Sequence, residues 1–231
     1  MLRVGLTGGL GSGKSTVARL FSACGAHILS ADSIGRELMQ PGQPVYAAIL
    51  AKFSPASGAP RLTCADGQLD RPALARYVFT AGRIPELNQI VHPAVIAEQQ
   101  RRIDAIAATD PHALVVVESA LIFEADQEGT APGWRDRFDR LILVTAPEPA
   151  RIRRFLDRAG EGRALTAEET QALEQDARQR IAAQIADQAK RPHCDFVIDN
   201  SGSAEELREQ VQRVCSALRA AQERAADSLR E

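Results

Sequence analysis

Long apolar runs and excess charge of one sign are both missing from this chain of 231 residues. No stretch approaches the roughly 20 consecutive apolar residues of a membrane span, and the opening MLRVGLT is too short an apolar stretch for a signal peptide. The 28 basic and 30 acidic residues nearly cancel, so no overall field attracts nucleic acid or a membrane surface. We therefore expect a soluble, cytoplasmic protein that binds neither nucleic acid nor membranes.

Paired cysteines are missing as well. The four cysteines are scattered, with no Cys-x-x-Cys pair to form a metal or redox site, which predicts free thiols in a reducing compartment. Lysine occurs only at positions 14, 52 and 190, and arginine supplies every other basic residue. We treat this as a bias of composition that assigns no function.

Five short apolar segments predict a parallel β-sheet. Each is rich in Val, Ile and Leu and ends in polar or small residues, as is typical of strands covered on both faces. The segments are residues 2–7, 27–31, 113–119, 140–146 and 196–200. Helical stretches separate them, so the pattern predicts an α/β fold, whose ligands bind at the carboxyl ends of the strands.

Two intervals are too long for simple connections between strands and predict inserted lobes. Residues 33–112 are first rich in turns and then helical, and residues 148–190 are rich in arginine and mostly helical. Within the second interval, Thr166 and Glu169 have the spacing of a capping box. The stretch 125–139, which holds the only tryptophan, is interpreted as a surface loop.

The last helical segment carries an apolar stripe that predicts packing on the sheet. Its members are Leu207, Val211, Val214 and Leu218. A contact between two copies of the chain is the alternative, so we expect a monomer or a weak homo-oligomer.

A phosphate-binding loop follows the first predicted strand. The residues Gly8-x-x-x-x-Gly13-Lys14-Ser15 match the Walker A pattern, with a strand before and a helix after. Glycines let the backbone N–H groups point at a phosphate, and the helix N-terminus adds partial positive charge. We expect Gly11, Ser12, Gly13 and Thr16 to contact ATP, Lys14 to neutralise its β- and γ-phosphates, and Ser15 to bind Mg²⁺.

Two carboxylates are candidates to direct phosphoryl transfer. Asp32 follows the second predicted strand, where it could orient or deprotonate an attacking hydroxyl; it could equally be the N-cap of the next helix. Glu118 ends the third strand, at the place of an acid that reaches Mg²⁺ through water. The alternative for Glu118 is a polar end to a buried strand.

Five further residues are weaker candidates. Arg151, Arg154 and Arg158 share one face of a predicted helix and could cover bound phosphates, or they could be solvated arginines on an exposed helix. Asn200 could bind a base edge or stabilise a turn. His92 precedes Pro93, which predicts that a helix begins there and favours a structural role.

Over nearly its whole length the sequence resembles the dephospho-coenzyme A kinase family. The segments GLTGGLGSGKSTV, LSADSIGREL, QPGQPVYAAIL, DGQLDRPALARYVF, LNQIVHP, VVVESALIFEA, RIAAQ and CDFVIDNSGS occur in that family's order. The phosphate loop alone is common to many enzymes, and the later segments make the resemblance specific.

The resemblance implies a P-loop kinase fold and the transfer of the ATP γ-phosphate to the ribose 3′-hydroxyl of dephospho-coenzyme A. Asp32 would then be the catalytic base or orienting group, with Arg36 and His92 among the substrate contacts. Lys14 and Arg154 would act on the transferred phosphoryl group, Arg158 and Asn200 on ATP, and Ser15 with Glu118 on Mg²⁺. The core would comprise residues 1–32, 113–147 and 191–220, with an acceptor-binding lobe at 33–112, a lid at 148–190 and a tail at 221–231.

Two other functions share the phosphate loop. A nucleoside-monophosphate-type kinase would also have an acceptor lobe and a lid, but a carboxylate such as Asp32 would repel an acceptor that is already an ionised phosphate. A nucleotide-binding switch or ATPase subunit would need a surface for a partner, whereas the two lobes here indicate that a small molecule is enclosed.

Overall fold

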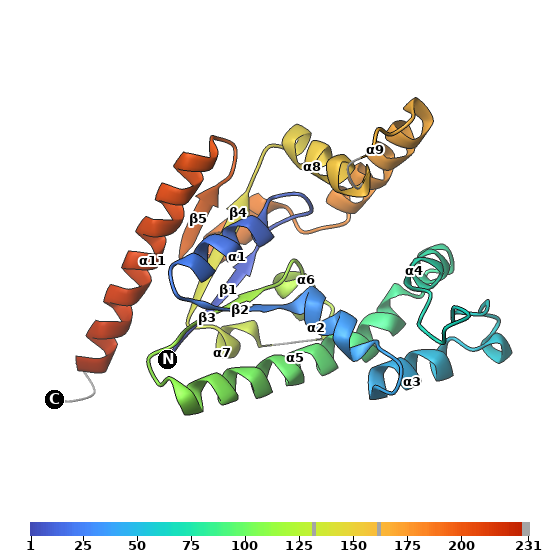
Figure 1. Cartoon of the computed structure of the whole chain (residues 1–231), viewed down its shortest axis with the longest axis horizontal. Helices are drawn as coiled ribbons and strands as arrows, with labels where there is room; N and C mark the ends of the chain where they lie inside the picture. The colour runs from blue at the N-terminus through green and yellow to red at the C-terminus, as the bar shows by residue number, and fades with distance from the viewer. Residues whose placement is uncertain (131–132, 161–162, 228–231) are drawn as a thin grey trace. The chain divides into compact units, whose positions relative to one another are not determined.

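A computed structural model of the chain describes residues 1–130, 133–160 and 163–227 and has an α/β architecture (Figure 1). The five strands form one parallel sheet in the order β2-β3-β1-β4-β5. They are β1 (Leu2–Thr7), β2 (His27–Ser30), β3 (Leu114–Glu118), β4 (Arg140–Thr145) and β5 (Phe196–Asp199). The predicted strands and the predicted fold class are confirmed.

Helices occupy most of the chain between the strands. They are α1 (Lys14–Ala23), α2 (Ala31–Leu38), α3 (Pro44–Lys52), α4 (Arg71–Thr80), α5 (Ile84–Thr109), α6 (Ile122–Gln127), α7 (Trp134–Arg137), α8 (Glu148–Gly160), α9 (Ala167–Ala182), α10 (Asp187–Lys190) and α11 (Ala204–Asp227), with short 3₁₀ turns η1 (Pro55–Ser57) and η2 (Arg191–His193). The predicted tail begins inside α11, and residues 228–231 lie outside the described residues.

The chain divides into two compact units. Unit 1 comprises Met1–Leu29, Ile106–Glu124 and Gly133–Glu231, and unit 2 comprises Ser30–Ala105 and Ala125–Pro132. Unit 1 therefore holds the sheet together with α8, α9 and α10, which belong to the interval expected to form a lid. Within it, α8 and α9 lie side by side (Figure 1).

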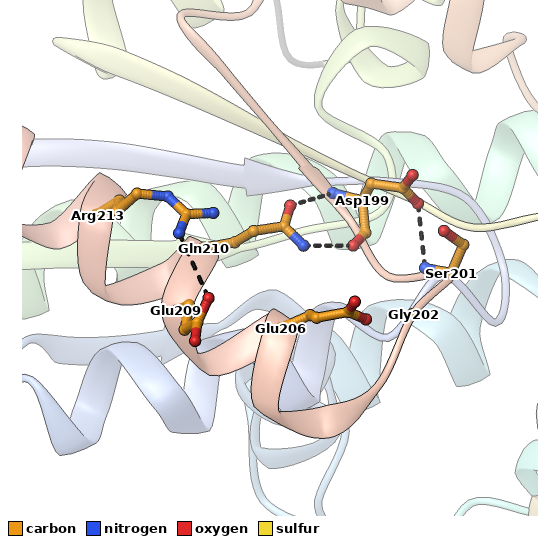
Figure 2. A pocket seen from close by; sticks show the side chains of 7 residues that line it. All are labelled: Asp199, Ser201, Gly202, Glu206, Glu209, Gln210 and Arg213. Atoms are coloured by element: carbon orange, nitrogen blue, oxygen red, sulfur yellow. Dashed lines mark hydrogen bonds and ion pairs between the residues drawn. The ribbon is translucent and has the colours of Figure 1, made fainter.

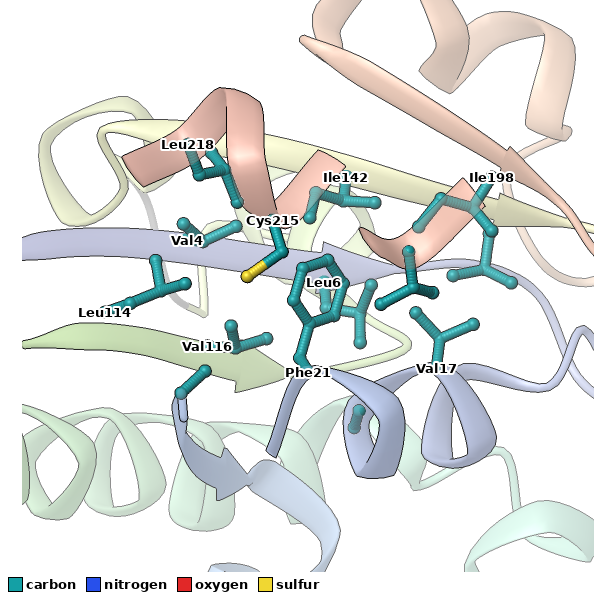
Figure 3. Close-up of a cluster of buried hydrophobic side chains, with 14 of the residues drawn as sticks. Val4, Leu6, Val17, Phe21, Leu114, Val116, Ile142, Ile198, Cys215 and Leu218 are labelled. Atoms are coloured by element: carbon teal, nitrogen blue, oxygen red, sulfur yellow. The ribbon is translucent and has the colours of Figure 1, made fainter. Parts of the chain in front are cut away.

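One face of the sheet in unit 1 is covered by α1 and α11. Apolar side chains of both helices meet alternate residues of the strands, as shown in Figure 3. From α11, Leu207, Val211 and Leu218 are buried in this cluster and Val214 packs against it. The predicted apolar stripe of the last helix therefore packs on the sheet.

Residues 133–138 pack on the rest of unit 1. Trp134 is 8% exposed and its ring meets that of Phe123 edge to face, with the ring centroids 5.2 Å apart. The interpretation of 125–139 as a surface loop is wrong at this residue, because burial of the large indole stabilises α7. Residues 131–132 of that stretch lie outside the described residues.

Unit 2 has a separate apolar core, formed by α3, α4 and the segment between them. Ile49, Phe53 and Leu62 are among its most buried members. Side chains of α5, including Leu87 and Ile90, pack against it.

The start of α9 and the state of the cysteines are as predicted from the sequence. Thr166 and Glu169 form the predicted capping box at the start of α9, with the side chain of each bonded to the backbone N–H of the other. All four cysteines are free thiols. Among the described residues, no helix is both long and apolar enough to cross a membrane.

We predict that Leu218→Ala lowers the free energy of unfolding of unit 1 by about 2–5 kcal/mol, because it leaves a cavity between α11 and the sheet. The measurement is urea unfolding followed by Trp134 fluorescence. The control Ser216→Ala lies on the exposed side of α11 and should change this free energy by no more than about 0.5 kcal/mol. Equal effects of the two substitutions would contradict the packing described for Leu218.

Candidate active site

The phosphate loop connects β1 to α1, as predicted. Its backbone turns at Gly11 and Gly13, whose φ angles of 69° and 96° lie in the left-handed region. A Cβ atom on Gly13 would lie 2.1 Å from the side-chain nitrogen of Asn200, so only glycine fits there. Helix α1 begins at Lys14 with no side-chain cap and no acidic residue in its first turn.

The carbonyl groups of the loop, from Gly8 to Gly13, all accept hydrogen bonds. Gly8 O and Gly9 O accept from Lys14 Nζ (2.8 and 3.1 Å), and Leu10 O accepts from Arg151 Nε (2.8 Å). Gly11 O and Ser12 O both accept from Arg154 Nη1 (3.3 Å each), and Ser12 O also accepts from Asn200 Nδ2 (2.8 Å). Gly13 O accepts from the N–H groups of Thr16 and Val17 (3.0 and 3.1 Å).

These bonds fix the orientation of the loop's peptide groups. No peptide bond among the described residues is cis, so the carbonyl of one residue and the N–H of the next point in opposite directions. Where Leu10 O and Ser12 O point out toward Arg151 and Asn200, the N–H groups of Gly11 and Gly13 therefore point to the other side. Such convergent N–H groups at an uncapped helix N-terminus bind anions, so the loop fits the phosphates of a nucleotide.

Ser15, in the first turn of α1, lies beside Glu118, the last residue of β3. The Ser15 hydroxyl donates to Glu118 Oε1 over 2.6 Å. Magnesium prefers such oxygen ligands and usually takes its others from water and substrate phosphates. The residues present therefore fit a nucleotide-bound Mg²⁺, and both positions predicted for the metal lie in this pair.

Helix α8 contains the three arginines predicted to share a face, and they differ in environment. Arg151 is buried; besides its bond to Leu10 O, its Nη1 lies 3.6 Å from Asp187 Oδ2. Arg154 donates to Gly11, Ser12 and also to Asn200 O (2.9 Å). Arg158 is exposed. Arg151 and Arg154 thus hold the phosphate loop, and contact of Arg154 and Arg158 with ATP stays a prediction.

Asn200 is buried after β5, and its amide nitrogen donates to Ser12 O. It therefore supports the loop, and its predicted place beside adenine is not tested. Beyond it, a pocket of about 390 Å³ lies at the turn into α11 (Figure 2). Asp199, Glu206, Glu209 and Arg213 line this pocket, and its net negative charge disfavours phosphate there.

In unit 2, Asp32 is not the N-cap of α2. Ser30 occupies that position and its hydroxyl accepts from the N–H of Ser33. Asp32 lies exposed in the first turn of the helix. The alternative of a capping role for Asp32 is therefore wrong, because the helix begins at Ala31, two residues earlier than the sequence indicated.

Helices α2 and α5 meet at Gly35 and Val95. A Cβ atom on Gly35 would be in ordinary contact with Val95, 3.7 Å away. Asp32 and Arg36, four residues apart, share an exposed face of α2. His92 lies on α5 one turn before Val95.

The expectation that a helix begins at His92 is wrong. His92 and Pro93 lie inside the 26-residue helix α5, since apolar contacts of α5 with the core of unit 2 outweigh the backbone bond that proline lacks. The Thr130 hydroxyl donates to Ala125 O (3.2 Å) and therefore accepts from His92 Nδ1, 2.8 Å away. Burial lowers the pKa of His92, and the nearby Glu128 opposes this effect. The neutral imidazole thus keeps Nε2 as an acceptor.

Three residues near the loop were not among the predicted site residues. Gln184 Oε1 accepts from the N–H of Leu10 (2.8 Å). Lys190 is fully buried and pairs with Glu124 Oε1 (2.7 Å), which also accepts from the N–H of Ile185 (3.2 Å). The only sequence features that pointed to Gln184 and Lys190 were the RIAAQ segment and the rarity of lysine.

A five-stranded parallel sheet with a phosphate loop after β1 and a serine–carboxylate pair beside it defines a P-loop kinase. Residues 2–206 match the family model described as dephospho-CoA kinase. The chain belongs to the dephospho-CoA kinase family.

Relatives and solved structures agree with this assignment. A dephospho-CoA kinase of Moorella thermoacetica is 38% identical over 91% of this chain and 89% of its own length. That of Corynebacterium diphtheriae is 38% identical over 88% and 90%. The chain covers only 46% of a longer relative from Mycolicibacterium paratuberculosis.

Among solved structures, TT1252 from Thermus thermophilus has a TM-score of 0.69 at 30% identity, covering 94% of this chain and 96% of that one. A dephospho-CoA kinase from Campylobacter jejuni has a TM-score of 0.64 at 20% identity, covering 95% and 98%, and shows the same fold.

We predict that the buried His92 makes the protein less stable at acidic pH. Because its pKa is lowered in the folded state, only the unfolded chain takes up a proton as the pH falls through about 6.5, and stability falls with it. Between pH 7.5 and 5.5, the melting temperature of the wild type should fall further than that of His92→Gln. The control His112→Gln removes an exposed histidine and should follow the wild type; a His92→Gln profile parallel to the wild type would contradict the prediction.

Proposed function

We propose that this protein phosphorylates the ribose 3′-hydroxyl of dephospho-coenzyme A with ATP, which gives coenzyme A in the last step of its biosynthesis. The observation that carries the proposal is the family match over residues 2–206, which includes the loop, the serine–carboxylate pair and both helices that carry the candidate substrate residues. The enzyme is a kinase with an alcohol group as acceptor and a small molecule as substrate.

ATP is held by the phosphate loop in this proposal. Gly11, Ser12, Gly13 and Thr16 contribute backbone and hydroxyl contacts to the phosphates. Lys14 carries the charge that neutralises the β- and γ-phosphates. Ser15 and Glu118 hold Mg²⁺, which when bound supplies positive charge to the same oxygens.

Asp32 accepts the proton of the attacking hydroxyl, or orients it. The support is that Asp32 is exposed and is not used as a helix cap, so its carboxylate is available to a substrate. Arg36 on the same helix face and the acceptor nitrogen of His92 bind the substrate. These roles follow from the family resemblance.

The lobes have separate tasks. Residues 33–112 bind the phosphate acceptor, and residues 148–190 cover the nucleotide, where Arg154 and Arg158 contact the phosphates and exclude water. Asn200 lies by the adenine. We further propose that the protein works in the cytoplasm as a monomer or weak homo-oligomer, without nucleic acid or membrane as a partner.

An acceptor panel tests the function. Purified protein is incubated with ATP and Mg²⁺ and with dephospho-coenzyme A, AMP, CMP, UMP or no acceptor, and ADP release is measured. Turnover with dephospho-coenzyme A alone is expected. Turnover of a monophosphate alone would favour the nucleoside-monophosphate-type kinase, and hydrolysis without any acceptor as the sole activity would reject both kinases.

We predict that Glu118→Gln raises the Mg²⁺ concentration for half-maximal turnover by about tenfold or more. The amide keeps an oxygen for the Ser15 hydroxyl and removes the charge that attracts the metal. A Mg²⁺ titration at saturating ATP measures this, with the exposed Glu205→Gln as control. An unchanged titration would exclude Glu118 as a metal ligand.

We predict that Asp32→Asn lowers kcat by about 10²–10⁴-fold, because the amide cannot take up the proton, while ATP affinity stays within about twofold. Steady-state kinetics and equilibrium ATP binding separate the two quantities. Asp104→Asn, an exposed site on α5, is the matched control. A nearly normal kcat in Asp32→Asn would rule out the proposed base.

A further inference from the structure

The peptide group between Gly9 and Leu10 is held at both ends. Its carbonyl, Gly9 O, accepts from Lys14 Nζ (3.1 Å) and from the N–H of Ser12 (3.2 Å). Its N–H group, on Leu10, donates to Gln184 Oε1 (2.8 Å). The carbonyl therefore points toward Lys14 and the N–H points away from it, toward Gln184.

The next peptide group has the opposite orientation. Leu10 O points to Arg151 Nε (2.8 Å), so the N–H of Gly11 points away from Arg151, on the side where the loop's N–H groups converge. The reversal between the two peptide groups falls at Leu10. The N–H of Leu10 therefore bonds to the protein, whereas the N–H of Gly11 points to the side where the loop binds a phosphate.

We infer that Gln184 is a positioning residue for ATP: by accepting from Leu10, it keeps the Gly9–Leu10 peptide in the orientation that lets the loop bind phosphates. Without this acceptor, a part-buried N–H group has no partner in the protein, and rotation of the peptide would restore one. The same rotation turns Gly9 O away from Lys14, so the ammonium group and the loop lose their relative positions.

The segment that carries Gln184 is itself fixed to unit 1. Next to Gln184, the N–H of Ile185 donates to Glu124 Oε1 (3.2 Å), and the same oxygen accepts from the buried Lys190 (2.7 Å). Asp187 lies 3.6 Å from Arg151, the residue on the other side of Leu10. Residues 184–190 are thus bonded at several points, which keeps the side chain of Gln184 in reach of the loop.

Lysine suits the buried pairing with Glu124 at position 190 better than arginine would. In a chain where 25 of 28 basic residues are arginine, lysine occurs at a position with no exposed surface. A compact ammonium group can pair with Glu124 in an enclosed space, whereas a planar guanidinium would need more room and more acceptors.

The test is equilibrium binding of ATP without any phosphate acceptor, measured by calorimetry on the full chain. Gln184→Met keeps the length of the side chain and removes the acceptor oxygen. It should weaken ATP binding by about tenfold, leave the KM for dephospho-coenzyme A unchanged, and shift the melting temperature no more than its control. The control Gln188→Met replaces an exposed glutamine on α10.

A readout on the loop itself separates positioning from a general structural role. In the protein without nucleotide, the Leu10 amide should exchange its hydrogen at least about tenfold faster in Gln184→Met than in Gln188→Met, since its hydrogen bond is lost. Gln184→Glu keeps an acceptor oxygen and should keep this amide protected. If Gln184→Met does not fold, Gln184→Ala, which adds no bulk, takes its place.

ATP binding within twofold of the control, in a folded variant that lacks the acceptor, would overturn the inference. The inference would also be overturned if the Leu10 amide exchanged as fast in Gln184→Glu as in Gln184→Met. The inference rests on the proposed use of ATP but not on the identity of its acceptor. If the proposed acceptor were wrong, the turnover measurements with the acceptor panel would show it, and the ATP-binding measurement would not change.

Discussion

A phosphate loop can bind an anion only if its carbonyl groups are kept away from that anion, and this requirement organises the site of this protein. Each carbonyl that points outward needs a hydrogen-bond donor, because an unpaired backbone group away from water is costly. The donors come from the end of β5, from α8 and from Lys14. The loop is therefore not autonomous: its shape depends on residues that follow it by more than 130 positions.

The arginines of α8 illustrate how the same residue type serves different ends. Arg151 and Arg154 donate to loop carbonyls, and the several N–H groups of a guanidinium let Arg154 reach three carbonyls at once. Arg158 is left exposed on the following turn. Its contact with ATP stays a prediction.

Local signals in the sequence predicted the sheet, the loop, the start of α1 and the capping box of α9. Each of these depends on residues that are near one another in the chain, such as the glycines before Lys14 or Thr166 with Glu169. The contact of Ser15 with Glu118 was also predictable, because Glu118 ends β3 and Ser15 begins the helix after the loop that follows the adjacent parallel strand β1.

The features that could not be predicted from the sequence depend on contacts between distant segments. Ser30 and not Asp32 caps α2, a difference of two residues that helix-start patterns do not resolve. Pro93 predicts the start of a helix, but packing on the core of unit 2 lets α5 continue through it. The bond of Gln184 to Leu10 joins residues 174 positions apart, and no periodicity or spacing encodes such a pair.

Because α8 lies so close to the loop, the residue allowed at position 9 depends on the residue at position 151. A Cβ atom on Gly9 would lie 2.0 Å from the guanidinium of Arg151, and one on Gly11 would lie 2.3 Å from the backbone oxygen of the same residue. A larger residue at position 9 is therefore compatible with the fold only where residue 151 is smaller or turned aside, so these two positions should covary among related sequences. Position 11 has no such freedom, since the atom it meets belongs to the backbone and no change of side chain removes it.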